Sequence, residues 1–223
     1  MVKVHHLNNS RSQRILWLLE ELGVPYEVVH YKRGEPVPMA PPELKKVHPL
    51  GKSPVITDGD LTLAESGVII DYLARKYGRE RLVPPLDTPA HLRYTYWLHY
   101  AEGSAMPPLL LKLVFDRLEL APVPFFVRPV VRMIARRAKR TFIEPQVRLH
   151  LDYLEGELAS HEWFVGTQFT AADIQMSFPL EAARARAGLD QGRPSLSAFL
   201  DRVQARPAYQ RALARGGPYQ LMG

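Results

Sequence analysis

The sequence predicts an α/β domain with the element order βαβ-α-ββα, followed by an all-helical domain. Strand and helix patterns alternate over the first 80 residues, and strand patterns almost disappear after residue 89. The chain has 223 residues, of which 46% are hydrophobic, which suits one or two compact domains with buried cores. We therefore expect domains at residues 1–80 and 90–223, joined by a linker at residues 81–89.

The first half of the α/β domain is expected to be a βαβ unit. Residues 2–5 alternate as a strand does, and Tyr26–Tyr31 forms a second strand pattern. Gly23 and Pro25 end the helix between them, and the two strands should be parallel. The apolar stripe of this helix consists of Ile15, Leu18, Leu19 and Leu22.

The second half is expected to be a short helix, a hairpin and a final helix. Residues 42–47 suit the short helix, and residues 58–60, Asp-Gly-Asp, form a strong hairpin turn between residues 55–57 and 61–63. The last helix is marked by Val68, Ile69, Tyr72 and Leu73.

Two helix starts are expected in the second part of the chain. Thr88 before Pro89 has the pattern of an N-cap with proline at the first helical position. Thr170 and Asp173 resemble a capping box, which fixes the start of a helix and has no catalytic role. Two helical stripes support the all-helical prediction: Val147, Leu151, Leu154 and Leu158, and Leu196, Phe199, Leu200 and Val203.

Composition excludes several classes of function. The chain has no cysteine, so reactive sulfur would have to belong to a bound ligand, and no disulfide is expected. The eight histidines show no metal-ligand spacing, and we expect no metal. No apolar run reaches the length of a transmembrane helix, and the start lacks a signal-peptide pattern, so we expect a cytoplasmic protein.

The formal net charge of +6 is partly concentrated at residues 128–140. A solvated helix face explains this segment better than a nucleic-acid site, because no nucleic-acid-binding motif accompanies it. A peripheral membrane segment at residues 121–140 is a further reading, since phenylalanines and valines interleave with arginines. Pro122, Pro124 and Pro129 interrupt the helix that this reading needs, and we expect no transmembrane segment.

Three short segments could bind a ligand. A cis Ser53–Pro54 bond at the start of a strand would expose backbone groups of Ser53 to an extended peptide, although an ordinary turn fits too. Glu65 and Ser66 begin a helix and suit the ammonium and carboxylate of an amino acid, although either could simply cap that helix. Residues 8–12, Asn-Asn-Ser-Arg-Ser, could cap the first helix or favour a thiolate.

The order and spacing of these pieces resemble the cytosolic glutathione S-transferases over nearly the whole chain. Ser10 with Arg14, residues 51–56 (GKSPVI), the hairpin, Glu65-Ser66 and the Thr170 capping box carry the resemblance. It implies a thioredoxin-like first domain and a glutathione transferase of the serine-using, bacterial type. It also implies a homodimer that takes glutathione as co-substrate and a small hydrophobic electrophile.

The resemblance also implies roles for individual residues. Ser10 would be the catalytic hydrogen-bond donor to the glutathione sulfur, with Asn9 or Ser12 as substitutes. Lys52, Ser53 and Pro54 would bind the tripeptide together with Glu65 and Ser66. No residue in 33–42 can be matched to the contact with the glycine end, and His48-Pro49 stands where the family often has Asn-Pro.

The resemblance places the electrophile between the domains, against the first helix of the second one. Tyr96, Tyr100 and Met106 could line its site, or could equally be domain core. The resulting thiolate would attack an electrophilic carbon, a peroxide or a disulfide. A non-catalytic glutathione-binding or regulatory module of the same fold is the alternative.

Overall fold

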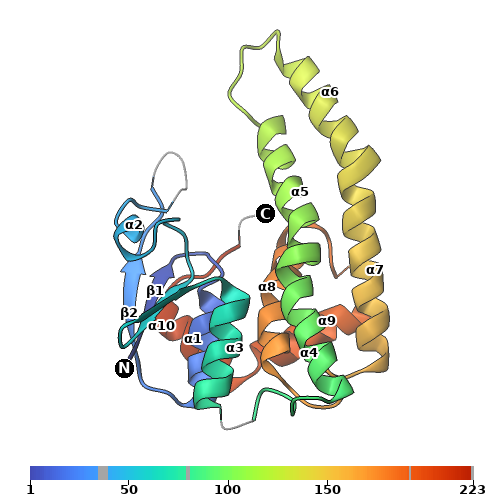
Figure 1. The fold of residues 1–223 in the computed structure, drawn as a ribbon. Coiled ribbons are helices and arrows are strands. Elements are labelled where there is room, and N and C mark those ends of the chain that lie inside the picture. Colours follow the sequence, from blue (N-terminus) through green and yellow to red (C-terminus); the bar gives the residue numbers. More distant parts are fainter. Residues whose placement is uncertain (35–39, 79–80, 191, 222–223) are drawn as a thin grey trace.

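The computed structural model describes residues 1–34, 40–78, 81–190 and 192–221. Figure 1 shows a domain of strands and short helices beside a larger array of helices, as the sequence predicts. Part of the segment without a matched glycine-end contact, residues 35–39, lies outside the described residues. The predicted boundary at residue 80 also lies outside them, so the domain limits stay a prediction.

The first domain is built on a four-stranded sheet in the order β2-β1-β3-β4. Strands β1 (Val2–Leu7) and β2 (Tyr26–Tyr31) are parallel, as expected for a βαβ unit. Strand β3 (Val55–Asp58) pairs antiparallel with β1 and forms the predicted hairpin with β4 (Leu61–Ala64). The sheet register places His5 of β1 opposite Val55 of β3.

Three helices accompany the sheet. Helix α1 (Gln13–Leu22) ends at Gly23, whose left-handed backbone, with φ of 67°, suits glycine. Helix α2 (Leu44–Val47) begins two residues later than the sequence suggests. Helix α3 (Ser66–Tyr77) begins directly after the hairpin.

The second domain is helical in all its described elements. A continuous helical stretch consists of α4 (Pro89–Tyr100), a π-helical turn η1 (Ala101–Ala105) and α5 (Met106–Glu119). A second one consists of α6 (Arg128–Ala138), the π-turn η2 (Lys139–Ile143) and α7 (Glu144–Ser160). The remaining helices are α8 (Ala171–Arg186), α9 (Pro194–Gln204) and α10 (Pro207–Gly216).

The two predicted helix caps are present. The Thr88 side chain accepts a hydrogen bond from the backbone N–H of His91, and Pro89 opens α4. At the start of α8, the Asp173 carboxylate accepts from the backbone N–H groups of Thr170 and Phe164, both at 2.8 Å. Because Asp173 is completely buried, this capping box also ties the preceding loop to the core.

The two domains share one core because the end of the chain returns to the first domain. Helix α10 packs against α1, and α8 also contacts α1 and α3. Helix α1 is consequently buried on more than its predicted stripe, with Gln13, Arg14, Leu16 and Trp17 inaccessible as well. A side chain at Gly216 of α10 would meet the side chains of Gln13 at 2.5 Å and Leu16 at 3.0 Å, so α10 approaches α1 closely here and both side chains would have to shift.

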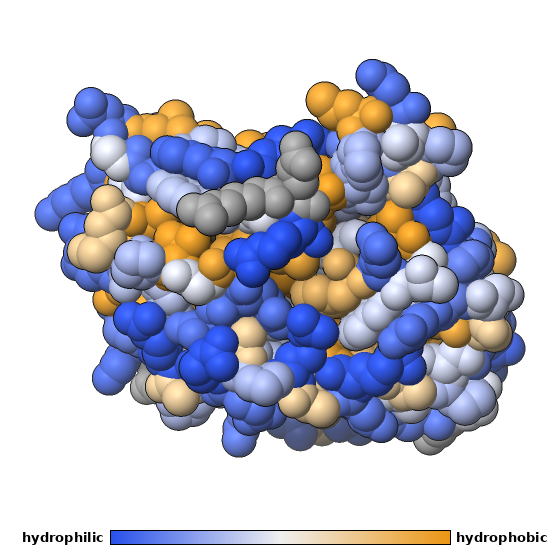
Figure 2. Space-filling model, turned by 90° about the horizontal axis from the view of Figure 1, so that it is seen from below, coloured by the Kyte–Doolittle hydropathy of each residue, from blue (hydrophilic) through white to orange (hydrophobic). Residues whose placement is uncertain are grey.

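One end of the molecule can be seen in the space-filling view (Figure 2). Figure 2, which views the end opposite the α5–α6 connection, shows mostly hydrophilic residues with separate hydrophobic patches. No helix among the described residues has the length and apolar character needed to cross a membrane.

Candidate functional site

The loop between β1 and α1 places Ser10 next to Ser12. Ser10 is buried, and its Oγ lies 2.8 Å from Ser12 Oγ and accepts a hydrogen bond from the Ser12 backbone N–H at 3.2 Å. The carbonyl of Ser10 accepts from the N–H of Gln13, the first residue of α1. The Ser10 hydroxyl is therefore held just before a helix N-terminus, where negative charge is favoured.

A buried histidine extends this pair of hydroxyl groups. His6 of β1 places Nδ1 2.9 Å from Ser12 Oγ, which also accepts from the backbone N–H of Leu7. Burial, reinforced by the neighbouring His30, lowers the pKa of His6 to about 4. His6 is therefore neutral at pH 7, and the chain His6–Ser12–Ser10 carries no charge of its own.

The same strand holds the segment with the predicted cis bond. The Ser53–Pro54 bond is cis, and Ser53 Oγ donates to the carbonyl oxygen of His5 at 3.0 Å. The backbone carbonyl of His5 thus holds Ser53, and the ring of the next residue, His6, contacts Ser12. Lys52 is exposed and makes no ion pair with the residues described.

The start of α3 places Glu65 and Ser66 on a large cleft. Glu65 has a φ of 68°, an unusual value for a residue other than glycine and one that recurs at binding sites. Its side chain is exposed, whereas Ser66 is buried. Both line a cleft of about 1060 Å³ between α3 and α4, which also includes Glu102 and Gln175.

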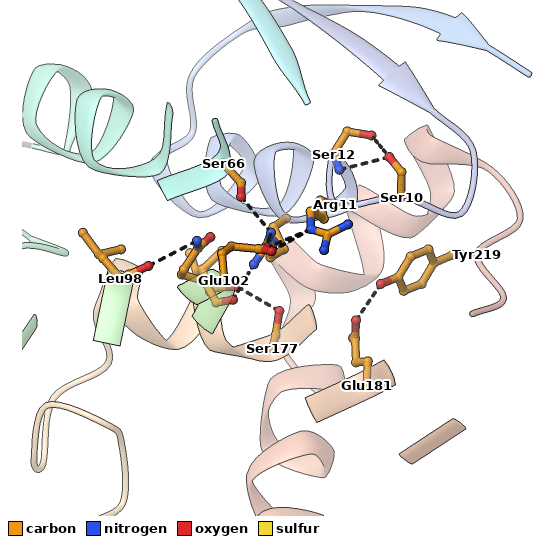
Figure 3. Close-up of polar contacts among 12 residues, drawn as sticks. Ser10, Arg11, Ser12, Ser66, Leu98, Glu102, Ser177, Glu181 and Tyr219 are labelled. Atoms are coloured by element: carbon orange, nitrogen blue, oxygen red, sulfur yellow. Dashed lines mark hydrogen bonds and ion pairs between the residues drawn. The ribbon is translucent and has the colours of Figure 1, made fainter. Parts of the chain in front are cut away.

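A buried arginine, Arg14, connects this helix start to the second domain through Ser66 and Glu102, which Figure 3 labels. One guanidinium nitrogen of Arg14, NH2, donates to Ser66 Oγ at 2.9 Å and to Glu102 Oε1 at 2.6 Å. The other, NH1, donates to the carbonyl oxygen of Gln175. Arg11 also binds Glu102, with Nε 2.9 Å from both carboxylate oxygens.

The Glu102 carboxylate is stabilised in its charged form. Burial alone would raise the pKa of Glu102, but the charges and hydrogen bonds of Arg14 and Arg11 outweigh it and lower the pKa below its usual value. Glu102 lies in the π-turn η1, a local widening of the helix that often occurs at functional sites. Phe178 of α8 lies against both guanidinium groups, 5.1 Å from each to the ring centroid.

The end of the chain lies against the Ser10 loop. The backbone N–H of Gln220 donates to Asn9 Oδ1 at 2.8 Å, and Arg33 donates to the carbonyl oxygen of Asn9. The Tyr219 hydroxyl donates to Glu181 Oε2 in α8, as Figure 3 shows. Asn9 therefore anchors the loop from both sides instead of pointing freely into a cleft.

The candidate electrophile-site residues lie in the helical domain. Tyr100 and Met106 are buried, and the Tyr100 hydroxyl lies 2.6 Å from His150 Nδ1. Tyr96 is exposed and stacks on Tyr100. This placement matches the core interpretation of Tyr100 and Met106, and their contact with an electrophile stays a prediction.

Sequence reasoning missed two residues of this arrangement. His6 lies in a strand pattern, and nothing in that pattern indicates that its ring nitrogen meets Ser12. The sequence around Glu102 does not indicate that it binds Arg14, because the two residues are 88 positions apart in the chain. Arg14 is a charged residue inside the apolar pattern of α1, and this position alone indicates that a buried acid lies nearby.

Within the described ranges, no group of three or more His, Asp or Glu side chains is arranged to hold a metal.

Comparisons with known proteins identify the family of this fold. The glutathione S-transferase N-terminal domain model matches residues 1–75, and the C-terminal domain model matches residues 123–207. Glutathione S-transferase 3 of Schizosaccharomyces pombe is 44% identical over 82% of this chain and 75% of its own length. Glutathione S-transferase 1 of Saccharomyces cerevisiae is 34% identical over 94% of this chain and 92% of its own length.

Solved structures show the same fold. A glutathione S-transferase from Actinobacillus pleuropneumoniae superposes with a TM-score of 0.79 at 34% identity, covering 99% of this chain and 95% of that one. A sphingomonad glutathione S-transferase solved with glutathione has a TM-score of 0.75 at 23% identity, covering 96% and 98% of the two chains. Together with the arrangement around Ser10, Ser53 and Ser66, these matches show that the chain belongs to the glutathione S-transferase family.

Proposed function

We propose that this transferase binds glutathione across Ser53, Glu65 and Ser66 and activates its thiol with Ser10. The observation that carries the proposal is that adjacent residues of β1 contact both parts of the site: the carbonyl of His5 binds Ser53, and the ring of His6 lies 2.9 Å from Ser12, the partner of Ser10. A peptide held by Ser53 would therefore lie close to the Ser10 hydroxyl. The proposal assigns the chain to the serine-using type of the family.

The charges at the site complement those of glutathione. The tripeptide carries one ammonium and two carboxylates. The exposed Glu65 carboxylate suits the ammonium, while the N-terminus of α3 and the Ser66 hydroxyl suit the neighbouring carboxylate. Ser66 Oγ accepts from Arg14, which leaves its own proton for the ligand. In the proposed complex, Pro54 would lie beside the extended backbone of the tripeptide, and Lys52 would reach a glutathione carboxylate.

The stabilisation required of Ser10 is within reach of a single hydrogen bond. A thiol with a pKa of about 8.5 is only about 3% ionised at pH 7. Lowering this pKa by about two units needs about 2.7 kcal/mol. A charge-assisted hydrogen bond gives about 1.5–3 kcal/mol, and a helix N-terminus adds about 0.3–1 kcal/mol.

The hydroxyl chain also determines whether the Ser10 proton is available to sulfur. If His6 carries its proton on Nδ1, it donates to Ser12, and Ser12 can turn its single proton to Ser10 Oγ at 2.8 Å in place of the Leu7 carbonyl oxygen at 3.3 Å. Ser10 then accepts two hydrogen bonds from Ser12 and directs its proton outward. The proposal requires this arrangement in the glutathione complex, where Ser12 and His6 act as positioning residues.

The reaction is nucleophilic attack by the bound thiolate. The thiol proton leaves to solvent, the sulfur forms a bond to an electrophilic carbon, and a leaving group such as chloride departs with the electrons of its own bond. The same thiolate could attack a peroxide oxygen or a disulfide sulfur. We place conjugation first, and a substrate panel distinguishes it from these two reductions.

The proposal retains four further expectations from the sequence. These are the homodimer, the small hydrophobic electrophile, the cytoplasmic location, and the domain limits at residues 80 and 90. Helix α4 leaves Leu92 and Tyr96 exposed, which is consistent with a second subunit packing on this helix. Sedimentation at several protein concentrations would test the homodimer.

Retention on immobilised glutathione combined with turnover of chlorodinitrobenzene tests the proposal. We expect the folded chain to be retained, to elute with free glutathione, and to form the conjugate with release of chloride. Retention without turnover of any electrophile, peroxide or disulfide would indicate the non-catalytic module instead. Absence of retention would contradict glutathione binding at this site.

A further inference from the structure

The connection between α5 and α6 projects from the body of the protein. Figure 1 shows this region extending beyond the other helices and away from the sheet. We call residues 120–140 the hairpin tip. Of the residues in α6, only Ala135 is buried, since the helix packs mainly on α5 and η2. The hairpin tip is therefore available to a partner larger than a small molecule.

The apex of the hairpin tip consists of large apolar side chains. Phe125 and Phe126 are 80% and 70% exposed, and their rings pack edge to face on each other. Helix α6 continues this surface with Val130, Met133 and Ile134, which share one face and are each more than half exposed. Several large exposed apolar side chains gathered on a projection indicate an interaction site.

Basic side chains surround the apolar surface. Residues 121–143 contain Arg128, Arg132, Arg136, Arg137, Lys139 and Arg140, and no aspartate or glutamate. Arg136 and Lys139 pair with acids of α5, chiefly Glu119. Among the described residues, no acid pairs with Arg128, Arg132, Arg137 or Arg140. The hairpin tip therefore offers unneutralised positive charge beside exposed aromatic rings.

The prolines do not prevent this surface from forming. From the sequence, Pro122, Pro124 and Pro129 are expected to interrupt an amphipathic helix. The structure places Pro122 and Pro124 before α6 and Pro129 in its first turn, where proline is tolerated. The helix after Pro129 is continuous to Ala138, so this objection to a membrane-binding segment is removed.

We propose that the hairpin tip docks on the surface of a bilayer that contains anionic lipids. Phe125 and Phe126 insert at the level of the headgroups, Val130 and Ile134 lie at the boundary, and the arginines pair with lipid phosphates. The protein binds at the surface and does not span the bilayer. This docking is independent of the glutathione site and would bring the transferase close to electrophiles dissolved in lipid.

A bilayer fits the hairpin tip better than a second copy of the chain. A symmetric contact between two tips would bring the same basic side chains together without any acid from this segment to neutralise them. A nucleic acid would satisfy the arginines, and a single strand could stack bases on the phenylalanines, but it would leave the aliphatic face of Val130, Met133 and Ile134 uncovered. An anionic bilayer satisfies both the charge and the apolar surface.

Flotation of the full chain with lipid vesicles tests the proposal. We compare vesicles of phosphatidylcholine with vesicles that also contain phosphatidylglycerol. The wild-type protein is expected to float only with the anionic vesicles and to be released as salt rises. The double variant Phe125→Ser/Phe126→Ser should bind at least about tenfold more weakly, and Arg132→Gln and Arg137→Gln about fivefold more weakly each.

Matched controls remove an exposed apolar side chain and an exposed cation elsewhere on the surface. Leu86→Ser removes a side chain that is 64% exposed in the linker, and Lys46→Gln removes an exposed cation of α2. Both should bind vesicles like the wild type. All variants should keep the wild-type circular dichroism spectrum and rate of glutathione conjugation without vesicles, because the hairpin tip has no part in the thiol site.

Three results would overturn the proposal. One is failure of the wild-type chain to float with anionic vesicles at low salt. Another is an equal loss of binding in the tip variants and the controls. The third is a change of oligomeric mass in Phe125→Ser/Phe126→Ser without any change in vesicle binding, which would assign the surface to a second copy.

Discussion

Arg14 NH2 lies 2.6 Å from Glu102 Oε1 and connects α1 of the first domain to the π-turn η1 of the second. Only 1% of the Arg14 side chain is exposed, so its charge depends on this carboxylate. The same nitrogen reaches Ser66 at the start of α3. One buried guanidinium thus links the domain interface to the residues that we assign to the glutamyl end of glutathione.

Replacing Glu102 with glutamine should lower the stability of the protein. The substitution leaves Arg14 buried without a counter-charge, a change that costs about 3–5 kcal/mol in comparable pairs. We expect a value near 3 kcal/mol, because the Glu102 side chain is 29% exposed. Urea unfolding followed by circular dichroism measures this change in the free energy of unfolding.

A surface pair provides the control for that substitution. Glu27 pairs with Lys3 on the sheet, and both side chains are more than 40% exposed. Glu27→Gln should change the free energy of unfolding by less than about 1 kcal/mol. Equal effects of Glu27→Gln and Glu102→Gln would show that the buried arginine does not depend on Glu102.

Replacing Ser10 with alanine should affect catalysis more than binding. The variant loses one charge-assisted hydrogen bond to sulfur, so the conjugation rate should fall about tenfold or more. Affinity for glutathione should stay within a few-fold, since the contacts of Ser53, Glu65 and Ser66 remain. Steady-state kinetics and calorimetry measure the two effects separately. Full activity in Ser10→Ala would transfer the role to Asn9 or Ser12.

The sequence predicts local elements of this protein better than contacts between distant ones. The hairpin at Gly59, the end of α1 at Gly23 and the capping box at Thr170 depend on the conformational preferences of a few adjacent residues, and all three are present. The proline of Ser53–Pro54 permits a cis bond, but an ordinary turn fits the sequence too, and the structure shows that the bond is cis.

Contacts that join distant segments are not encoded in local patterns. Helix α1 shows one apolar stripe, but α10 covers a second face of it, and no spacing within α1 reveals this. Likewise, the link between Arg14 and Glu102 and the chain from His6 to Ser10 depend on how helices and strands pack in space. The arrangement of the site, and the parts of His6 and Glu102 in it, therefore required the structure, whereas Ser10, Ser53 and Ser66 could be named from the sequence.

His6 should make the protein less stable in mild acid. Its pKa is about 4 in the folded protein and about 6.5 when unfolded, so the unfolded state takes up the proton first as the pH falls. Stability should therefore fall between pH 6.5 and pH 4, by an amount on the order of 3 kcal/mol, and this contribution should level off below pH 4. Urea unfolding across this range measures the slope.

The substitution His6→Asn isolates this contribution. It should flatten the slope between pH 6.5 and pH 4, whereas His99→Asn, at an exposed histidine of α4, should leave it as in the wild type. An unchanged slope in His6→Asn would mean that His6 is not the buried neutral group responsible for the acid sensitivity.

Removal of the Asp173 carboxylate should weaken the helical domain. Asp173→Ala leaves the N–H groups of Phe164 and Thr170 without their buried acceptor, at a cost of about 2–4 kcal/mol. Asp60→Ala, in the exposed hairpin turn, should change the free energy of unfolding by less than about 0.5 kcal/mol. Thermal and urea unfolding of both variants test this difference, and similar values would contradict a structural role for the capping box.

The ionisation of glutathione in its complex with the protein tests the central claim most directly. Thiolate absorbance is titrated against pH with glutathione bound to the wild type and to Ser10→Ala. We predict that the bound thiol has a pKa about two units below the free value of about 8.5, and that most of this shift is lost in Ser10→Ala. A bound thiol that titrates like free glutathione in the wild-type protein would contradict activation by Ser10.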